Sequence, residues 1–524
     1  MLMNIEFPER FNMADYFLYH NVEEGREHKR CLYFRDESYT YGDAVRMSNR
    51  AGNALLASGM EVEDRVLFVL PDCPEFAWAW FGASRAGGVI TMVNPLLPAA
   101  DYKYYLEYTR ARVALIDESL VETFAEAAEG AKYLRRVLVR ESGERKFGGD
   151  DEQGKFVSLA RVMDAMPDEL TPAETHRDDI AIWLFTSGST GHPKGAVHMH
   201  HDLPFNTEAY AKRVLGISEH DLTVSVPKLF FGYATGTNLL FPFAVGGATA
   251  LFSERSTPEK IFEMIERYRP TILTSVPTMI NGMLNVERAG ERDLSSLRMC
   301  LSAGEALPVE LYERWMQAFG VEILDGIGSA EMFHIYITNR PGDVQPGSLG
   351  RIVEGYEAEV VNAEGQRVQT GEMGTLRIKG DSAALCYWQA HEKSKQTFAG
   401  DWCTTGDQFH VDDAGYYWYH GRTDDMLKVS GVYVAPVEIE NCLLQHNAVL
   451  ECAVVGHDTG DGLVKPKAFV VLREGRAPNQ EMEQDIKDFV KSKIALYKYP
   501  RWIEFVASLP KNDRGKIDRK QLKK

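Results

Sequence analysis

The sequence predicts an α/β protein built from more than one compact unit. Strand-like and helix-like segments alternate through most of the 524 residues, and short strands of alternating polarity follow from about Gly350. A last stretch of about a hundred residues has its own order of helices and strands. A chain of this length exceeds one ordinary core and suggests about three or four compact units.

The alternation of strands and helices is clearest in the first part of the chain. Apolar runs that predict buried strands lie at 65–70, 89–94, 111–117, 181–187, 248–252 and 271–277. The segments 75–87 and 258–268 have the pattern of helices between them. Such alternation favours largely parallel sheets.

The later segments predict two further units. The strands at 357–362, 374–380 and 415–421 are short and alternate in polarity, which indicates an antiparallel β unit. Helices at 435–446 and 482–494, with strands at 450–458 and 465–474, indicate a small α+β domain. The polar residues Thr423–Asp425 follow a completed strand, so we place the boundary there, between 1–423 and 424–524.

Composition and charge exclude several classes of protein. The net charge of -18 argues against a nucleic-acid binder, which needs clustered Lys and Arg. The most apolar region is interrupted by Asp72, Glu75 and Arg85, so it predicts core and not a membrane span. The seven cysteines include no Cys-x-x-Cys pair, which favours free thiols in a cytoplasmic protein.

One loop carries a signal for phosphate. The stretch "TSGSTGHPKG" (186–195) combines glycines, hydroxyls and Lys194, and such loops can hold anionic oxygens on backbone N–H groups. It is not a Walker A loop, because Pro193 precedes the lysine and Gly195 follows it. The next residues predict a short strand and not the start of a helix.

Further polar stretches have ordinary explanations when each is taken alone. "SAGEAL" (302–307), "DGIGSAEM" (325–332) and "WCTTGD" (402–407) fit turns at strand ends, and "PKNDRGKIDR" (510–519) fits a solvated tail. Together and in this order, with "GRTDD" (421–425) and the phosphate loop, they change the interpretation. The sequence then resembles the adenylate-forming superfamily of acyl-CoA synthetases, nonribosomal adenylation domains and firefly-type luciferases, over nearly the whole chain.

The resemblance implies a fold and a reaction. The fold is a large N-terminal domain of two αβ layers with a β-barrel-like unit, followed by a small, mobile α+β C-terminal domain. In the reaction, a carboxylate attacks the α-phosphate of ATP, diphosphate leaves, and a thiol then takes the acyl group from the acyl-adenylate. Because an anion approaches a polyanion, the protein must supply positioning and positive charge.

The resemblance also implies roles for individual residues. Lys516 matches the lysine that neutralises charge at the reacting carboxylate and phosphate, and Glu331 matches the magnesium carboxylate. Asp424 matches the hinge, and Gly431 lies on the face that meets the pantetheine of coenzyme A. The implied ATP contacts are Thr186, Ser187, Gly188, Ser189, Thr190, Gly191 and Lys194 for the phosphates, Gly304, Glu305 and Asp325 for adenine, and Asp407 and Arg422 for ribose.

One position departs from the family pattern. The family usually has Thr before the magnesium carboxylate, and its hydroxyl meets the α-phosphate, but here the residue is Ala330. Loss of one such donor costs on the order of 1–3 kcal/mol if nothing replaces it. Ser329 or a water could substitute.

The acid is predicted from a narrower resemblance. "KLFFGYATG" (228–236) and "GIGSAEMFHIY" (326–336) look most like the benzoate–CoA ligase branch, which implies an acyl pocket made by Gly232, Tyr233, Ala303, Gly328, His334 and Ile335. Small residues leave a flat slot in which Tyr233 can pack on a ring, and His334 is expected to contact the substrate carboxylate or ring. The nearby His198, His200 and His201 lack Cys or acidic partners at zinc spacing, so we do not predict a metal there.

The expected partners are therefore an aromatic or alicyclic carboxylate, ATP, Mg²⁺ and coenzyme A, and the branch suggests a homodimer. Substituted benzoates are not separated from benzoate by these residues. A ligase for cyclohexane or cyclohexene carboxylates or medium-chain acids is the alternative within the same chemistry. A nucleotide-binding regulator without catalysis is a second alternative, prompted by Ala330. A Walker-type ATPase is a third alternative, which the missing Gly-Lys-Ser/Thr disfavours. Such an enzyme would release ADP, whereas adenylation releases AMP.

Overall fold

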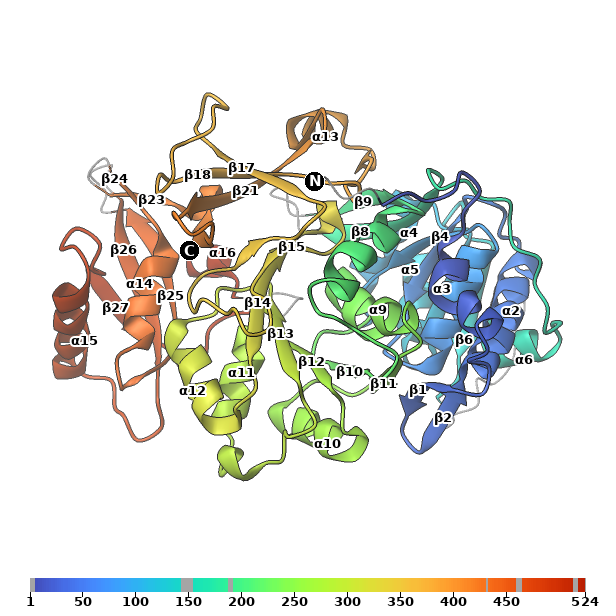
Figure 1. Cartoon of the computed structure of the whole chain (residues 1–524), viewed down its shortest axis with the longest axis horizontal. Helices are drawn as coiled ribbons and strands as arrows, with labels where there is room; N and C mark the ends of the chain where they lie inside the picture. Colours follow the sequence, from blue (N-terminus) through green and yellow to red (C-terminus); the bar gives the residue numbers. More distant parts are fainter. Residues whose placement is uncertain are drawn as a thin grey trace.

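The computed structural model of the protein describes residues 5–142, 154–186, 192–429, 432–458, 464–511 and 517–523. Two large sheets and a smaller one are built by residues up to Arg422, and two further small sheets lie in the last hundred residues (Figure 1). Helices cover the outer faces of the large sheets. The α/β class predicted from the alternating segments is confirmed.

The first large sheet has eight strands. In spatial order they are β19 (Cys386–Tyr387), β9 (Lys194–Met199), β8 (Ile180–Thr186), β4 (Val89–Met92), β3 (Arg65–Val69), β5 (Val113–Asp117), β6 (Arg136–Arg140) and β7 (Phe156–Ser158). All but β9 run in the same direction, because β9 pairs antiparallel with both β8 and β19. Every residue of β5 is buried, as expected of a parallel strand covered on both faces.

Helices pack on both faces of this sheet. One face carries α4 (Ala99–Thr109) and α5 (Val121–Ala128), and the other carries α2 (Tyr41–Ala57), α3 (Pro74–Arg85) and α6 (Leu159–Asp164). At the start of α2, Thr40 and Asp43 exchange side-chain and backbone hydrogen bonds, which satisfies two of the free N–H groups at that end.

The second large sheet has nine strands. They are β16 (Arg351–Ile352), β15 (Ile335–Thr338), β14 (Ile323–Gly328), β13 (Met299–Ala303), β12 (Ile272–Ser275), β10 (Leu222–Ser225), β11 (Ala248–Leu251), β1 (Arg30–Phe34) and β2 (Glu37–Thr40). Its outer face packs on α10 (Pro258–Tyr268), α11 (Pro277–Leu284) and α12 (Val309–Phe319). The inner face shares one continuous apolar core with the first sheet.

Shorter helical segments fill the space near and between the sheets. They are η1 (Asp15–Tyr19), α1 (His20–Glu23), η2 (Glu118–Leu120), α7 (Asp202–Asn206), η3 (Thr207–Lys212), α8 (Gly232–Thr235), η4 (Gly236–Leu240), α9 (Phe241–Phe243), η5 (Ala289–Glu291) and η6 (Ala330–Met332). Within the described ranges, no helix combines the length and the apolar character that a membrane crossing would need.

The predicted antiparallel unit follows. It contains β17 (Glu357–Val361), β18 (Gly374–Lys379), β20 (Phe398–Ala399), β21 (Trp402–Val411) and β22 (Tyr417–Arg422), with α13 (His391–Thr397) beside it (Figure 1). The strands pair in an open order that ends at β17 and β20. In addition, β22 pairs with β21, so these strands form the antiparallel β unit that the sequence predicts.

The last hundred residues have a core of their own. A hairpin of β23 (Leu427–Val429) and β24 (Val432–Val434) precedes a sheet of β25 (Val449–Asp458), β26 (Val464–Leu472) and β27 (Trp502–Phe505). Around them lie η7 (Thr423–Asp425), α14 (Pro436–Leu444), α15 (Gln480–Lys493) and α16 (Arg519–Leu522). The apolar side chains of α14, α15, β25 and β26 pack together, as the predicted α+β domain requires.

Candidate active site

Strand ends from all three N-terminal sheets carry the predicted site residues. Thr186 ends β8 and pairs with Lys194, which begins β9. Ala303 ends β13, and Gly328 ends β14. Asp407 lies in β21 opposite Arg422, the last residue of β22. Ligand sites in α/β proteins form where the carboxyl ends of strands meet, so this placement suits a shared site.

A carboxylate and an ammonium group meet at Tyr387. The Tyr387 hydroxyl donates a hydrogen bond of 2.5 Å to Oε1 of Glu331, and Nζ of Lys194 lies 4.9 Å from the centre of the Tyr387 ring. Burial and the charge of Lys393 lower the pKa of Lys194, while the charge of Glu331 acts to raise it. Tyr387 was not predicted from the sequence, since nothing in "CYW" distinguishes it from a core tyrosine.

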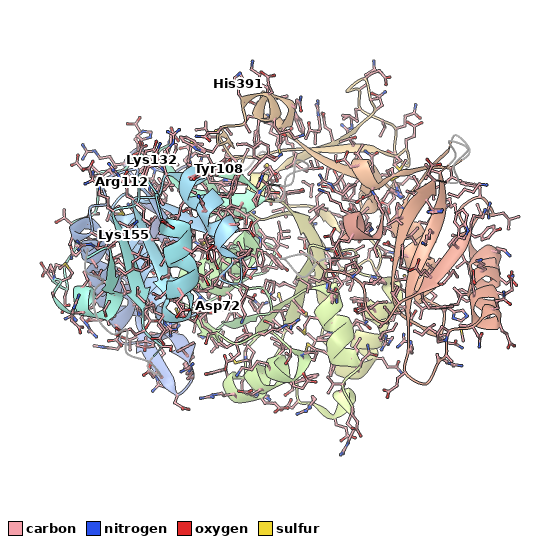
Figure 2. All side chains as sticks on the ribbon, turned by 180° about the vertical axis from the view of Figure 1, so that it is seen from behind. Asp72, Tyr108, Arg112, Lys132, Lys155 and His391 are labelled. Atoms are coloured by element: carbon pink, nitrogen blue, oxygen red, sulfur yellow. The ribbon has the colours of Figure 1, made fainter. Side chains whose placement is uncertain are left out.

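The described end of the phosphate loop is fixed by helix α4. The Tyr104 hydroxyl donates to the carbonyl of Pro193 at 2.7 Å, and the Tyr108 hydroxyl accepts from the Gly195 N–H at 3.2 Å. Tyr108, labelled in the rear view of Figure 2, also donates to the carbonyl of Trp388 at 2.6 Å. These contacts fix the start of β9, and therefore the backbone that carries Lys194.

The second charged pair lies on the antiparallel sheet. Nη1 of Arg422 donates to Oδ1 of Asp407 at 3.2 Å. Burial raises the pKa of Asp407, whereas the Arg422 charge opposes that rise. The charge of Glu331 is near enough to affect both residues, so the pair predicted for ribose lies near the carboxylate that Tyr387 contacts.

The residues predicted for adenine lie together at the ends of β13 and β14. Gly304 makes the turn after β13 with φ of +90°, a conformation that favours glycine. Oε2 of Glu305 accepts hydrogen bonds from the N–H and the hydroxyl of Thr278, at 3.2 and 2.8 Å. Burial raises the pKa of Asp325 to about 8, and the charge of Glu305 adds to that rise.

The acyl-pocket residues converge on His334. Its Nε2 donates to the main-chain carbonyl of Tyr233 at 3.0 Å, and its ring lies 4.8 Å from that of Phe241 and 5.6 Å from that of Tyr210. Burial lowers the pKa of His334 to about 3, so the ring is neutral near pH 7 and its Nδ1 is an acceptor. This arrangement favours contact with the ring of a substrate over contact with its carboxylate.

Two glycines leave the room that His334 occupies. A Cβ atom at Gly236 would lie 2.5 Å from Cδ2 and 2.7 Å from Nε2 of His334, and a Cβ atom at Gly328 would collide with the His334 carbonyl. Gly232 faces Leu184 and the carbonyl of Phe333. Ile335 follows at the start of β15, buried, and its carbonyl accepts from Asn206 at 2.8 Å. The structure thus brings Tyr233, Gly328 and His334 together and adds Gly236, which the sequence did not single out.

The histidines at the end of β9 and just after it, His198, His200 and His201, make contacts within the protein. His198 donates from Nε2 to the carbonyl of Ala330 at 2.7 Å, and its Nδ1 lies 2.7 Å from Oδ2 of Asp202. Both side chains are fully buried. His200 accepts from the Met13 N–H, so its ring is directed elsewhere. The pair His198 and Asp202 therefore fixes the backbone next to Glu331, which sequence reasoning missed because the contact spans 132 positions.

Magnesium would have one protein carboxylate here. Among the described residues, no three His, Cys, Asp or Glu side chains are grouped as a metal site. A single carboxylate fits an ion that takes most of its ligands from nucleotide phosphates and water, which is how Mg²⁺ is commonly held. Glu331, with one oxygen fixed by Tyr387, is the residue that suits this role.

The remaining predicted residues lie at or outside the limits of the described chain. Asp424 is exposed in η7, directly after Thr423, whose hydroxyl donates to the Gly406 carbonyl at 3.0 Å and accepts from Nε2 of Gln408 at 2.7 Å. Position 423 is thus attached to β21, while position 424 is not attached in this way. Outside the described residues lie Ser187, Gly188, Ser189, Thr190, Gly191, Gly431 and Lys516.

Comparison with known proteins gives the family. Residues 18–388 match the AMP-binding enzyme family, and residues 438–516 match the AMP-binding enzyme C-terminal domain. The chain is 44% identical to a benzoate–CoA ligase of Thauera aromatica over 523 residues, which cover 99% of this chain and 97% of that protein.

Two solved structures are similar over almost the full length. One is the anthranilate CoA ligase AuaEII in complex with anthranoyl-AMP, with a TM-score of 0.92 and 40% identity over 98% of this chain and 97% of that one. The other is a benzoate CoA ligase from Burkholderia xenovorans, with a TM-score of 0.89 and 42% identity over 98% of this chain and 100% of that one. The motifs, the fold and these matches agree, and the chain belongs to the AMP-binding family of adenylate-forming enzymes.

Proposed function

We propose that the chain is an ATP-dependent aryl-CoA ligase, which converts benzoate or a substituted benzoate, ATP and coenzyme A to aryl-CoA, AMP and diphosphate. The observation that carries the proposal is full-length similarity to a benzoate–CoA ligase, together with the convergence of Lys194, Glu331, Asp407 and Arg422. In the first step the carboxylate oxygen bonds to the α-phosphorus, and the bond from that phosphorus to diphosphate breaks.

Each charged residue serves a different part of the nucleotide. Lys194 offsets charge on the outer phosphates, and Asp407 accepts hydrogen bonds from the ribose hydroxyls beside Arg422. Glu331 would hold Mg²⁺, which would neutralise phosphate charge when bound. Tyr387 fixes the Glu331 carboxylate, and the carbonyl contact from His198 fixes its backbone. Fixed donors and charges of this kind lower the barrier because they need no reorganisation during the reaction.

The acid binds on the aromatic side of the site. Tyr233, Phe241 and the neutral ring of His334 form a surface on which a planar ring can pack, and Gly232, Ala303 and Gly328 add little bulk. This arrangement supports an aromatic acid over the alternative of an alicyclic or medium-chain acid, whose thicker shape would press against His334. Ile335 backs the pocket from β15.

The second step transfers the acyl group to coenzyme A after the small domain turns. We place the domains at 1–423 and 424–524, with Asp424 as the hinge. The attachment of Thr423 to β21 and the exposure of Asp424 support that boundary. Lys516 serves adenylation and Gly431 faces the pantetheine, on the strength of the motif resemblance alone. The thiolate attacks the acyl carbon and AMP leaves.

The proposal is tested by measuring nucleotide products with ATP, Mg²⁺, benzoate and coenzyme A, each left out in turn. AMP that forms only with all four is the expected result. AMP that forms with cyclohexane carboxylate or octanoate but not with benzoate would favour the alternative substrates. ADP would contradict adenylation altogether.

Assembly and location are separate parts of the proposal. We infer a homodimer in the cytoplasm, supported by the family branch and by seven free cysteines, six of them buried. Light scattering of the purified protein is expected to give twice the chain mass of 59.0 kDa. A mass of one chain would contradict the homodimer and leave the catalytic proposal unchanged.

A further inference from the structure

Position 330 offers no side-chain hydrogen bond to a nucleotide. Its methyl group is apolar, and its carbonyl already accepts from His198. Yet the α-phosphate of ATP must lie between the ribose and the outer phosphates, because it is covalently joined to both, and Glu331 would hold the Mg²⁺ that accompanies the outer phosphates. Under the proposed function this means between Asp407 and Glu331. The question is which donor of this chain faces that place.

Two buried hydroxyls next to Ala330 lack partners. The hydroxyls of Ser329 and Tyr336 are shielded from solvent, and within the described ranges neither finds a hydrogen-bond partner. Ser329 lies close enough to act on the pKa of Tyr336, but the two hydroxyls do not form a bond of normal geometry. Buried polar groups are almost always satisfied, so a pair of exceptions beside a ligand site indicates that the ligand completes them.

The backbone directs Tyr336 in an unusual way. In the pairing of β14 with β15, Ile327 faces Ile337 and Gly328 faces Ile335. Tyr336 is therefore the extra residue of a β-bulge. Bulges re-aim one side chain and occur often beside active sites. Without the bulge, the alternation of β15 would turn the residue at this position to the opposite face.

The groups that act on the Tyr336 hydroxyl indicate its surroundings. Burial raises its pKa, and the next contributions come from Asp407, Cys403 and Glu331. Asp407 and Glu331 are the residues proposed for ribose and metal, and they lie on different elements. The hydroxyl thus lies near both. Because its pKa is raised, the phenol keeps its proton at neutral pH and remains a donor.

We propose that the Tyr336 hydroxyl, with Ser329 beside it, donates a hydrogen bond to the α-phosphate of the nucleotide. Tyr336 then supplies, from β15, the donor that Ala330 does not supply from η6. The inference rests on the proposed assignments of Asp407 and Glu331, but not on the identity of the acid.

The test compares the binding of AMP and adenosine by calorimetry in the wild type and in Tyr336→Phe. The two ligands differ only in the phosphate. We expect the Kd for AMP to rise about 10-fold or more, as for loss of one bond to a charged group, and the Kd for adenosine to change less than 2-fold. Equal changes for both ligands, or no change for AMP, would overturn the proposal. Ser329→Ala is a second variant, with a smaller shift expected in the same direction.

Tyr356→Phe is the matched control. It also removes a buried tyrosine hydroxyl, but one that already bonds to Ser382 at 2.7 Å and Asn206 at 2.8 Å. We expect it to lower the melting temperature while leaving the ratio of AMP to adenosine affinity unchanged. If Tyr356→Phe shifted that ratio as much as Tyr336→Phe, the effect would be one of packing and the proposal would fail.

Position 330 gives an independent check. Ala330→Thr in the Tyr336→Phe background is expected to recover most of the lost AMP affinity, because the new hydroxyl lies one residue from Ser329. A double variant no better than Tyr336→Phe would break the proposed link between the two positions. None of these measurements needs the acid, so AMP binding that follows the prediction in a protein inactive with every aryl acid would refute the ligase and keep the phosphate contact.

Discussion

The two sides of the candidate site are built on opposite principles. On the side proposed for the nucleotide, Lys194, Glu331, Asp407 and Arg422 come from separate elements and act on one another through charge. On the acyl side, His334 is neutral and enclosed by rings of Tyr233, Tyr210 and Phe241. Charge acts over several ångströms and tolerates small displacements, whereas packing against a ring does not. Substitutions on the two sides should therefore have different effects on nucleotide binding and on turnover of the acid.

The largest effect is expected for Lys516→Ala. Removing the charge proposed to face the reacting oxygens should slow adenylate formation by about 100-fold or more. Transfer from a supplied acyl-adenylate to coenzyme A should be nearly unaffected. Both half-reactions are measured separately, and Lys511→Ala, which removes a lysine paired with Glu451 at 3.4 Å, is the control. An equal loss in both half-reactions would contradict the role proposed for Lys516.

Gly236→Ala should damage the acyl side alone. The added methyl group collides with the imidazole of His334 and displaces it. Because positioning of the acid depends on that ring, kcat/KM for the acid should fall about 10- to 100-fold. AMP binding should stay within 2-fold. Gly290→Ala is the matched control, since a Cβ atom there meets nothing within 4 Å. If AMP binding fell together with acid turnover, the two sides would not be separable in the way described.

Tyr387→Phe should weaken the nucleotide side moderately. The Glu331 carboxylate loses the donor that orients it, and loss of such outer partners costs about 10-fold in metal affinity. The expected result is a higher Mg²⁺ requirement with an unchanged KM for the acid. Tyr416→Phe removes a similar bond from tyrosine to carboxylate, to Asp343 at 2.7 Å on the surface, and should have no effect. A normal Mg²⁺ titration for Tyr387→Phe would contradict the positioning role.

The smallest effect is a pH dependence of stability at Asp325. Its pKa is raised from 3.8 to about 8 by burial, so between these values the native state holds a proton that the unfolded state releases. Its contribution to stability is thus present below about pH 4 and is lost as the pH rises towards 8. Asp325→Asn should remove this decline. The urea midpoint of this variant should therefore fall less steeply than that of the wild type between pH 5 and pH 8.

Asp293→Asn serves as the control for that titration. The hydroxyl and N–H of Ser295, and then Arg269, lower the pKa of this exposed carboxyl to about 2, so it should add no slope between pH 5 and pH 8. Parallel curves for the wild type and Asp325→Asn would mean that Asp325 ionises normally in the folded protein.

Local patterns predicted the elements well where periodicity was strong. The helix predicted at 258–268 is α10, Pro258–Tyr268, and the strand predicted at 65–70 is β3, Arg65–Val69. The residues proposed for the nucleotide could be picked out because charged and glycine-rich motifs are local. Gly236 looked like any glycine in "GYATG", since its importance depends on His334 almost a hundred positions later.

The contacts that the sequence did not predict are those set by tertiary packing. Tyr387 reaches Glu331 across 56 positions, and His198 reaches Ala330 across 132. The bulge at Tyr336 depends on how β14 and β15 align, which no short pattern specifies.

The attachment of Thr423 to β21 has a practical consequence. Arg422 and Asp424 are two residues apart, a distance of at most about 7 Å along the chain. If Arg422 contacts the nucleotide and Asp424 is the hinge, as proposed, a fluorophore or spin label at position 424 would report nucleotide occupancy and rotation of residues 424–524 at the same time. One labelled position could follow the whole catalytic cycle in real time, from ATP binding to release of the thioester.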